Sequence, residues 1–402
     1  MKHYKINVPK VYITAVPYNF RSYYLWLLYG LYELNEQGKI ILSFQKMKLE
    51  DRLIHKSQRC REKSKRIRRL FNLQEEPIYS YTSYNLQGFI IYNDKKIKFC
   101  YDIADSPFLF DIKLLHSVDH YFKAQCPKEI SSDGFPLTSS IRIPYHPDVL
   151  TYKSKIHASM IGPRCLCYCS IFDYDRMKAA YKMMINDKMP IKDGILMCYF
   201  GNACGPIPIP THNTPDYNSE SEIMGYFKEK INHPNEKRAI LAHIISEKGK
   251  GYDARIINPG NSDTLDNSLE RTDLIIPLNQ FCKHISRFQY NLNVSGYRNS
   301  IPNRFIESFA VGTAILTDKL HVKWYLPFGK EVIELSEMGY LPISEINWNK
   351  VKQDIDNLPP VNDQEVLKAY NSKWAPTTFA EYIVDTVLRQ TTVSYTHLTL
   401  PT

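Results

Sequence analysis

The chain has 402 residues, of which 44% are hydrophobic and 13% aromatic, and its formal net charge is +9. This length predicts two or three domains, and the apolar content excludes an intrinsically disordered chain. Most of the charge lies in residues 52–69, where nine basic residues and one acidic residue give 9 − 1 = +8. The nearly neutral remainder makes a nucleic-acid-binding protein unlikely on composition.

The chain contains neither a secretory signal nor 18 consecutive apolar residues. Its nine cysteines are an odd number and favour reduced thiols over a disulfide framework. We therefore expect a cytoplasmic protein, peripheral at the inner face of the membrane if it binds a membrane. Residues 393–402 (VSYTHLTLPT) resemble a translated sequencing adapter, so the native chain is expected to continue differently from there.

In the first half, strands are separated by helical patterns. Residues 10–16, 22–36 and 40–44 read as strand, helix and strand, which is one βαβ unit. Strands at 88–92 and 97–101 are joined by Asn93-Asp94, a pair typical of a tight hairpin turn. Proline and serine then interrupt residues 127–152, which indicates the approach to a domain boundary.

The second half repeats the α/β pattern. Its nearly continuous apolar strand at 193–200 is typical of a parallel sheet covered on both faces. The other predicted elements are helices at 174–186, 237–247, 302–310, 362–370 and 377–388 and strands at 253–257, 273–276 and 313–317. We predict an α/β protein of two doubly wound, Rossmann-like domains facing each other across a cleft. Their expected bounds are 1–170 and 171–375, with a helix at 376–392 that could cross back.

One segment carries most of the predicted chemistry: residues 295–318, SGYRNSIPNRFIESFAVGTAILTD. Pro302 suits the first turn of a helix that ends at Gly312, and an apolar strand follows. Arg298 and Arg304 then lie near the start of a helix that follows a strand, an arrangement that favours phosphate. Glu307, one turn further on, suits a pair of sugar hydroxyls.

The run Arg304 to Ala314 (RFIESFAVGTA) resembles the nucleotide-sugar segment of GT-B glycosyltransferases, in the R-x-x-E form of exostosin-like, Leloir-type enzymes. The resemblance implies that Glu307 binds the donor's ribose and that Arg304 and Arg298 bind its diphosphate. Retaining GT-B families carry a second glutamate eight residues earlier, where this chain has Asn299. The alternative is an ordinary helix–strand joint with surface arginines.

Further donor contacts are predicted around this segment and at the end of the apolar strand. The strand at 193–200 runs into a glycine-containing loop, which would let the backbone approach a diphosphate. The additional donor-binding candidates are Gly201, Asn202, Gly312 and Thr313.

A catalytic base should come from the first domain, because the acceptor hydroxyl loses its proton as it attacks. Asp105 is the first candidate, since it follows a predicted strand at the end where such sheets bind ligands. Asp102 comes next, with His116 and His120 behind it. For each, a capping or surface role is the alternative. Asn19 and Arg21 follow the first strand at the same edge and are candidate acceptor contacts.

No metal or other cofactor is predicted. Cys165, Cys167 and Cys169 could share one face of a strand, but no fourth ligand stands at zinc spacing. The D-x-D form of residues 173–175 is better explained as a helix cap. Residues 52–69, read as a helix, have a narrow and weakly apolar stripe edged by cations, which suits a solvated face, an anionic membrane or acceptor, or, less well, nucleic acid.

The sequence thus predicts a glycosyltransferase that moves a sugar from a nucleoside diphosphate sugar to a glycan or lipid-linked acceptor, in the synthesis of cell-surface polysaccharide or glycoconjugate. A non-catalytic module of the same fold that binds a sugar nucleotide or glycan is the alternative. A nucleic-acid binder acting through residues 52–69 is a third, less favoured reading.

Overall fold

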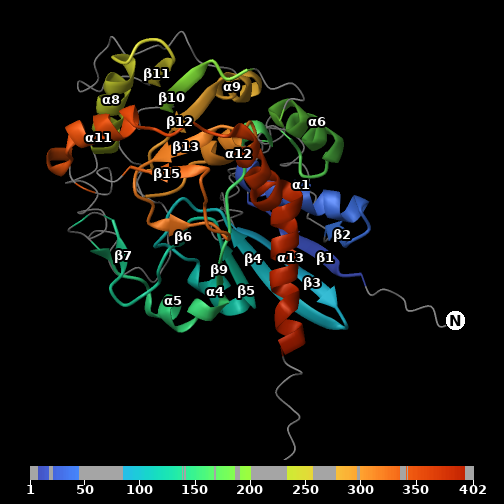
Figure 1. Ribbon diagram of the computed structural model, residues 1–402. Helices are drawn as coiled ribbons and strands as arrows, with labels where there is room; N and C mark the ends of the chain where they lie inside the picture. The colour runs from blue at the N-terminus through green and yellow to red at the C-terminus, as the bar shows by residue number, and fades with distance from the viewer. Residues whose placement is uncertain are drawn as a thin grey trace, which may run out of the picture.

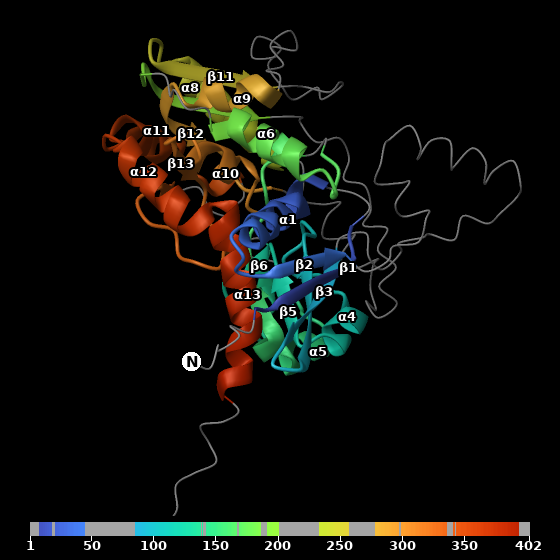
Figure 2. The ribbon, with the colours of Figure 1, turned by 90° about the vertical axis from the view of Figure 1, so that its right-hand side faces the viewer.

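A computed structural model describes residues 8–17, 21–44, 85–137, 139, 142–166, 169–185, 191–200, 233–256, 278–296, 299–335, 341 and 343–393. Two main sheets dominate this part of the chain, one in each half (Figures 1 and 2). Both are rich in parallel strands and are accompanied by helices, which confirms the α/β prediction and is consistent with two Rossmann-like domains.

The first sheet has the strand order β2-β1-β3-β4-β5-β9. Its strands are β1 (Lys10–Ala15), β2 (Ile41–Phe44), β3 (Asn85–Tyr92), β4 (Lys95–Asp102), β5 (His120–Lys123) and β9 (Ile156–Ala158). Only β3 runs against the others, since it pairs antiparallel with both β1 and β4. The β3–β4 turn is the predicted hairpin, with φ values of 48° at Asn93 and 58° at Asp94 as a type I′ turn requires.

The second sheet is entirely parallel, in the order β11-β10-β12-β13-β15. Its strands are β10 (Gly194–Phe200), β11 (Tyr252–Ile256), β12 (Phe288–Leu292), β13 (Ala314–Thr317) and β15 (Val332–Glu334). The chain order reverses between β10 and β12, and doubly wound sheets bind ligands at the carboxyl ends of such a pair of strands. The strand predicted at 273–276 lies outside the described residues.

Short strands and helices complete the structure. The remaining strands are β6 (Cys126–Pro127), β7 (Phe135–Pro136), β8 (Arg142–Ile143) and β14 (Val322–Lys323). The α-helices are α1 (Arg21–Glu36), α4 (Ile112–Ser117), α5 (Pro147–Thr151), α6 (Tyr174–Ile185), α8 (His233–Ser246), α9 (Leu278–Ile285), α10 (Arg304–Phe309), α11 (Trp348–Asp356), α12 (Asp363–Ala369) and α13 (Pro376–Val393), and Tyr370–Trp374 forms a π-helical turn before α13. In the second half α8 packs on β10 and β11, and α10 packs on β13.

The last helix, α13, lies against the first sheet's half of the molecule. Figure 1 shows it running from the second half down alongside β4. It packs on α1, where the indole N–H of Trp26 donates to the carbonyl of Trp374 over 3.1 Å. Tyr382 adds a hydrogen bond to the carbonyl of Ala158, at 2.7 Å. The N-terminal and C-terminal segments therefore share one core.

An aromatic cluster continues this core toward α10. Trp324, Phe328 and Trp374 pack against one another with ring centroids 5.2–5.4 Å apart. Phe309 of α10 packs on the same rings, and Tyr325 connects the cluster to Phe379 of α13. Burying several large rings together supplies much of the apolar area that holds α10 and α13 in place.

No helix among the described residues has both the length and the apolar character needed to cross a bilayer.

Gly30 of α1 marks the closest approach of α13. A Cβ at this position would collide with the carbonyl of Pro376 and lie 2.8 Å from the Cβ of Ala380. We predict that Gly30→Ala lowers the free energy of unfolding by about 2–3 kcal/mol, because backbone atoms of α13 must move. Urea denaturation measures the change.

The control is Gly38→Asn, just after the same helix. Gly38 has a φ of 69° and open space around its missing Cβ, and asparagine tolerates that backbone conformation. Its effect should stay within about 0.5 kcal/mol. Equal effects of the two substitutions would show that α13 does not depend on close contact at Gly30.

Candidate functional site

The segment between β12 and α10 leaves the sheet at its strand-order reversal and is held in place on its own side by Asp318. The carboxylate of Asp318, buried at the end of β13, accepts hydrogen bonds from the backbone N–H and the hydroxyl of Ser295, both at 2.7 Å. The backbone N–H of Asn293 also donates to the carbonyl of Leu316 at 2.8 Å. The start of this segment is therefore fixed relative to the strands.

The same segment is tied to the first half of the molecule. The side-chain amide of Gln125, just after β5, donates to the carbonyl of Ile301 and accepts from its N–H, at 3.0 and 2.8 Å. Asn299 donates to the carbonyls of Pro136 and Leu137 at 3.2 and 3.0 Å. Strands β6 and β14 form a short antiparallel ladder nearby.

Asn299 is the residue that stands where retaining GT-B families carry a second glutamate. Its φ of 56° is a left-handed conformation that asparagine adopts more readily than most residues. Its amide makes hydrogen bonds between the two halves of the molecule, which gives a structural reason for an asparagine at this position.

Glu307 is 1% exposed and pairs with Arg164, which comes from the segment that follows the first sheet. Its Oε1 accepts from the backbone N–H and Nε of Arg164 at 3.0 and 3.3 Å, and its Oε2 accepts from Nη2 at 3.4 Å. The charge of Glu307 is the main reason why the pKa of Arg164 is raised. In this structure both oxygens of Glu307 accept from Arg164, so a ribose would share this carboxylate with Arg164.

Arg304, at the start of α10, lies among other arginines. Burial, followed by the charges of Arg164 and Arg238, lowers its pKa to about 10, while Glu307 opposes the shift. Its guanidinium stands 5.6 Å from the ring centroid of Tyr199 in β10. The carboxylate of Glu307 compensates these cations only in part, so an anionic ligand would relieve their repulsion.

The pKa of Tyr23, on α1, is affected by charged groups from both halves of the molecule. Burial, and then the carboxylate of Asp105, raise the pKa of Tyr23 to about 12. The charges of Arg164 and Arg304 act in the opposite direction. Tyr23 therefore lies within electrostatic reach of Asp105, after β4, of Arg164, in the segment that follows the first sheet, and of Arg304 in the second half. Asp105 itself is exposed.

Asp102, the second candidate base, is buried in the first half. Its Oδ2 accepts from the ammonium of Lys123 and the hydroxyl of Tyr121, both at 2.7 Å, and its Oδ1 accepts from the N–H of Ala104 at 2.8 Å. With an exposure of 2%, it serves the end of β4 and does not face solvent. Between the two aspartates, only Asp105 is accessible to an acceptor.

His116 and His120 also have partners. The His116 ring contacts Asp148 at 2.9 Å, and the His120 ring contacts His157 at 2.9 Å. His120 stands at the start of β5, at the opposite end of the strand from Lys123. This position does not favour His120 as a base.

Gly312 and Thr313 lie at the far end of α10 from Arg304, and their assignment to the donor site stays a prediction. They precede β13, so they stand at the amino-terminal edge of the second sheet, away from Arg304. The hydroxyl of Thr313 donates to the carbonyls of Ile285 and Phe288, and the ammonium of Lys192 donates to Thr313 at 3.0 Å. Gly312 has a φ of 70° and ends the helix beside Asp363.

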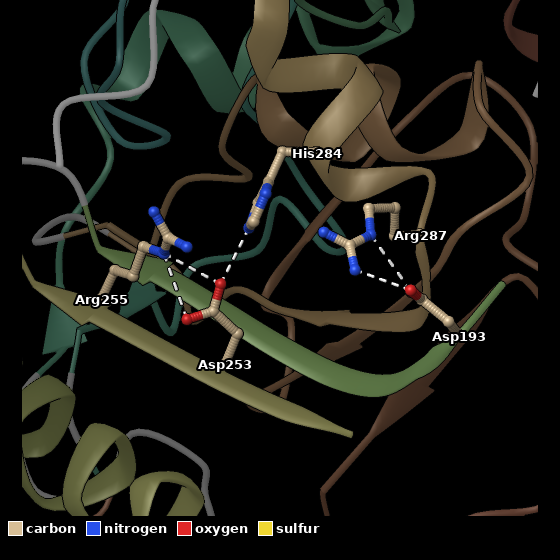
Figure 3. Close-up of polar contacts among 5 residues, drawn as sticks. All are labelled: Asp193, Asp253, Arg255, His284 and Arg287. Atoms are coloured by element: carbon tan, nitrogen blue, oxygen red, sulfur yellow. Dashed lines mark hydrogen bonds and ion pairs between the residues drawn. The ribbon is translucent and has the colours of Figure 1, made fainter. Parts of the chain in front are cut away.

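Other ion pairs gather at this amino-terminal edge (Figure 3). Asp253 accepts from Arg255 at 2.9 Å and contacts His284 at 2.8 Å. Burial alone would raise the pKa of Asp253, but the His284 contact and the Arg255 charge outweigh it, so the pKa is lowered. Arg287 and Asp193 form an exposed pair at 2.6 Å just before β12 and β10. This cluster joins strands and a helix at the edge opposite to the strand ends that bind ligands.

Several predicted contacts fall outside the residues whose placement is described. They are Asn19, Gly201, Asn202, Arg298, Cys167 and the basic residues 52–69. Of Arg21, only the helical backbone at the start of α1 is described. These assignments remain predictions.

The structure bears on the two segments that were considered as metal sites, the cysteines at 165–169 and the D-x-D segment at 173–175. Residues Arg164–Leu166 form a 3-10 turn, so the predicted cysteine strand is wrong at Cys165. Asp173 accepts from the N–H of Arg176 at 3.0 Å, which is the capping contact expected at the start of α6. Within the described ranges, no three or more His, Cys, Asp or Glu side chains are grouped so as to hold a metal ion.

Three residues of the site were not predicted from sequence: Tyr23, Arg164 and Arg238. Arg164 follows a glycine and a proline in a stretch without periodicity, and Tyr23 belongs to a helix with several similar tyrosines. Arg238 lies on α8, and its ring contact with Phe200 at 5.9 Å joins it to the end of β10. No local pattern marks any of the three, because their proximity depends on the tertiary structure.

Comparisons with known proteins give only distant similarity. No protein-family model and no curated protein matches the chain, so the resemblance to exostosin-like enzymes gains no support from either search. Among solved structures, the chain is similar to one of the GtfA/B complex, with 9% identity, 77% of this chain and 71% of that chain covered, and a TM-score of 0.31. It is also similar to the pneumococcal O-GlcNAc transferase GtfA in complex with UDP and GlcNAc, with 11% identity, coverages of 78% and 70%, and a TM-score of 0.22. At these scores neither likeness bears on function.

Glu307→Gln tests the central ion pair without changing side-chain shape. It removes the charge that compensates Arg164 and Arg304, so we predict a loss of about 2–3 kcal/mol in the free energy of unfolding. Urea denaturation at pH 7 gives the value.

Glu381→Gln on α13 is the matched control, since it breaks an exposed pair with Lys39 whose side chains are 54% and 40% accessible. That change should cost less than about 1 kcal/mol. If Glu307→Gln costs no more than Glu381→Gln, the buried pair does not constrain the structure.

Proposed function

We propose that this protein is a glycosyltransferase that transfers a sugar from a nucleoside diphosphate sugar to a hydroxyl group of a glycan or lipid-linked acceptor. One observation carries the proposal: Tyr23 interacts electrostatically with Asp105 and Arg164 of the first half and with Arg304 of the second. A potential base and a cluster of cations thus lie near one another.

The two groups suit the two halves of the reaction. As the acceptor hydroxyl attacks the anomeric carbon, it loses a proton, and the exposed carboxylate of Asp105 is suited to accept it. The bond to the diphosphate breaks at the same centre, and negative charge accumulates on the departing oxygen. Arg304 and Arg164 supply fixed positive charge there, which lowers the barrier without reorganisation during the reaction.

The acceptor belongs, in this proposal, to the first half of the molecule. Asn19 and Arg21 follow β1 at the same edge as Asp105 and are the proposed acceptor contacts. The basic residues 52–69 are proposed to attract an anionic acceptor or membrane surface, so the enzyme would work in the cytoplasm at the inner face of the membrane. We do not propose nucleic acid as a partner.

A non-catalytic module that binds a sugar nucleotide or glycan is the second candidate. The observation that favours it is Asn299, whose amide holds the joint between the halves where a retaining enzyme would carry a glutamate. Turnover distinguishes the two, since donor hydrolysis or transfer with any UDP, GDP or TDP sugar excludes a pure binding module.

Arg304→Gln tests the donor site. We predict that UDP, GDP or TDP raises the melting temperature of the wild type, and that the dissociation constant of the best of them rises about 10- to 100-fold in the variant. Calorimetry measures the affinity.

Arg287→Gln removes the same charge from the opposite edge of the same sheet and serves as the control. The affinity of this variant for the nucleoside diphosphate should match that of the wild type. Equal affinity in the wild type and in Arg304→Gln would exclude Arg304 from the donor site.

Asp105→Asn tests the base. The substitution keeps the size of the side chain but removes its basicity, so kcat should fall about 10²- to 10⁴-fold while nucleotide affinity changes little. Transfer is measured at saturating donor.

Asp94→Asn is the control, because Asp94 is exposed in the β3–β4 turn and asparagine tolerates its φ of 58°. It should leave kcat unchanged. A kcat in Asp105→Asn close to that of Asp94→Asn would exclude Asp105 as the base.

A further inference from the structure

Three buried hydrogen-bond donors lack a partner within one stretch of the chain. They are Nδ2 of Asn293, Nδ2 of Asn303 and Nε of Arg304, all between the end of β12 and the first residue of α10. Asn293 is 1% exposed and Asn303 is 8% exposed. An unsatisfied buried donor costs about 1–3 kcal/mol, and native proteins contain few of them, so three within a dozen residues require an explanation.

Asn303 stands at a position where its side chain would ordinarily serve the helix. It is the N-cap residue of α10, yet its side chain makes no capping hydrogen bond. The other asparagines that cap described helices do so: Asn347 accepts from the N–H of Lys350 and Asn362 from that of Gln364, both at 3.1 Å. The side chain of Asn303 is thus buried without making the capping hydrogen bond that is usual at this position.

Asn293 lies on the same side of the sheet as α10. Two residues earlier on β12, the amide of Asn291 donates to the hydroxyl of Ser308 on α10 at 2.9 Å. Side chains two apart on a strand share a face, and the step from Asn291 to Asn293 is about 7 Å along the strand.

The matching step along α10 leads to Arg304. Because β12 and β13 are parallel, α10, which connects them, runs in the opposite direction to the strands. Going from Ser308 to Arg304 therefore leads toward the carboxyl-terminal edge of the sheet, as does going from Asn291 to Asn293. Four helical residues span about 6 Å. Asn293 is therefore level with Arg304, as Asn291 is level with Ser308.

The unpartnered atoms are all donors, so their missing partner must be a group rich in acceptors. Arg164 and Arg238 add positive charge around Arg304, while the oxygens of Glu307 are already occupied by Arg164. A phosphoryl group, with several acceptor oxygens and negative charge, fits both the donors and the charge.

We infer that Asn293 and Asn303, together with Arg304, bind one phosphoryl group of the donor's diphosphate. This inference rests on the proposed function and adds two residues to it. The amides would donate to the diphosphate as it departs without adding positive charge to a site that already holds several arginines. The cost of burying them unsatisfied in the free protein would be recovered when the ligand binds.

Asn293→Leu and Asn303→Leu test the inference through two measurements: the melting temperature of the free protein and its affinity for pyrophosphate. Leucine has nearly the size of asparagine and needs no hydrogen bond, so the melting temperature of the free protein should stay the same or rise. The dissociation constant for inorganic pyrophosphate should rise about 10- to 100-fold in each variant. A residue that merely supports the fold would show a lower melting temperature and unchanged affinity.

Asn291→Leu is the matched control on the same strand face. Its amide Nδ2 already has Ser308 as partner, so its replacement should change pyrophosphate affinity less than about threefold. The two kinds of asparagine should therefore differ in their effect on pyrophosphate affinity.

A second pair of variants uses charge. Asn303→Asp places a carboxylate beside the phosphoryl group and should weaken pyrophosphate binding at least about tenfold. Asn347→Asp makes the same change at the cap of α11, where aspartate also caps well, and should have no effect.

Wild-type titrations with pyrophosphate, UDP, GDP and TDP separate this inference from the proposed function. Tighter binding of one nucleoside diphosphate than of pyrophosphate identifies the nucleotide as the source of the phosphoryl group. If the wild type binds a nucleoside diphosphate and all asparagine variants bind it equally well, the inference is overturned and the proposed function stands. If the wild type binds none of the four, both are overturned.

Discussion

The buried pair between Glu307 and Arg164 is the interaction on which the rest of the site depends. A carboxylate with 1% exposure needs a partner, and Arg164, which contacts both its oxygens, comes from the other half of the molecule. The start of α10 and the segment after the first sheet are consequently held together. Arg304 then remains as a cation next to an already satisfied pair, and this is what makes the site attractive to an anion.

The residues after β12 belong structurally to both halves. Asp318 fixes their beginning from within the second sheet, whereas Gln125 and Asn299 fix their end through backbone carbonyls and N–H groups across the joint. The donor side of the proposed site is therefore positioned by the same contacts that set the relative orientation of the two sheets, and a change in one would alter the other.

The sequence predicted most strands of both sheets but missed β5, β9, β15 and β12, the last of which stands beside the order reversal. Its residues Phe288–Leu292 alternate apolar with Gln289 and Asn291, which disguises a strand buried in a parallel sheet. Asn291 is tolerated there because Ser308 accepts its amide hydrogen. The 295–318 motif indicated Arg304 and Glu307, but Arg164 could not be predicted, since only the tertiary structure brings it to Glu307. Gly312 and Thr313 of the same motif lie at the other end of α10 from Arg304.

The docking of α13 on α1 has a consequence for the order of folding. The buried face of α1, with Trp26 and the close approach at Gly30, is covered by residues that follow Trp374. During synthesis the first sheet can pair its strands early, yet one side of α1 stays uncovered until the residues that follow Trp374 have been made. The docking of α13 is thus a late step of folding, and until it occurs α1 exposes apolar side chains such as Trp26.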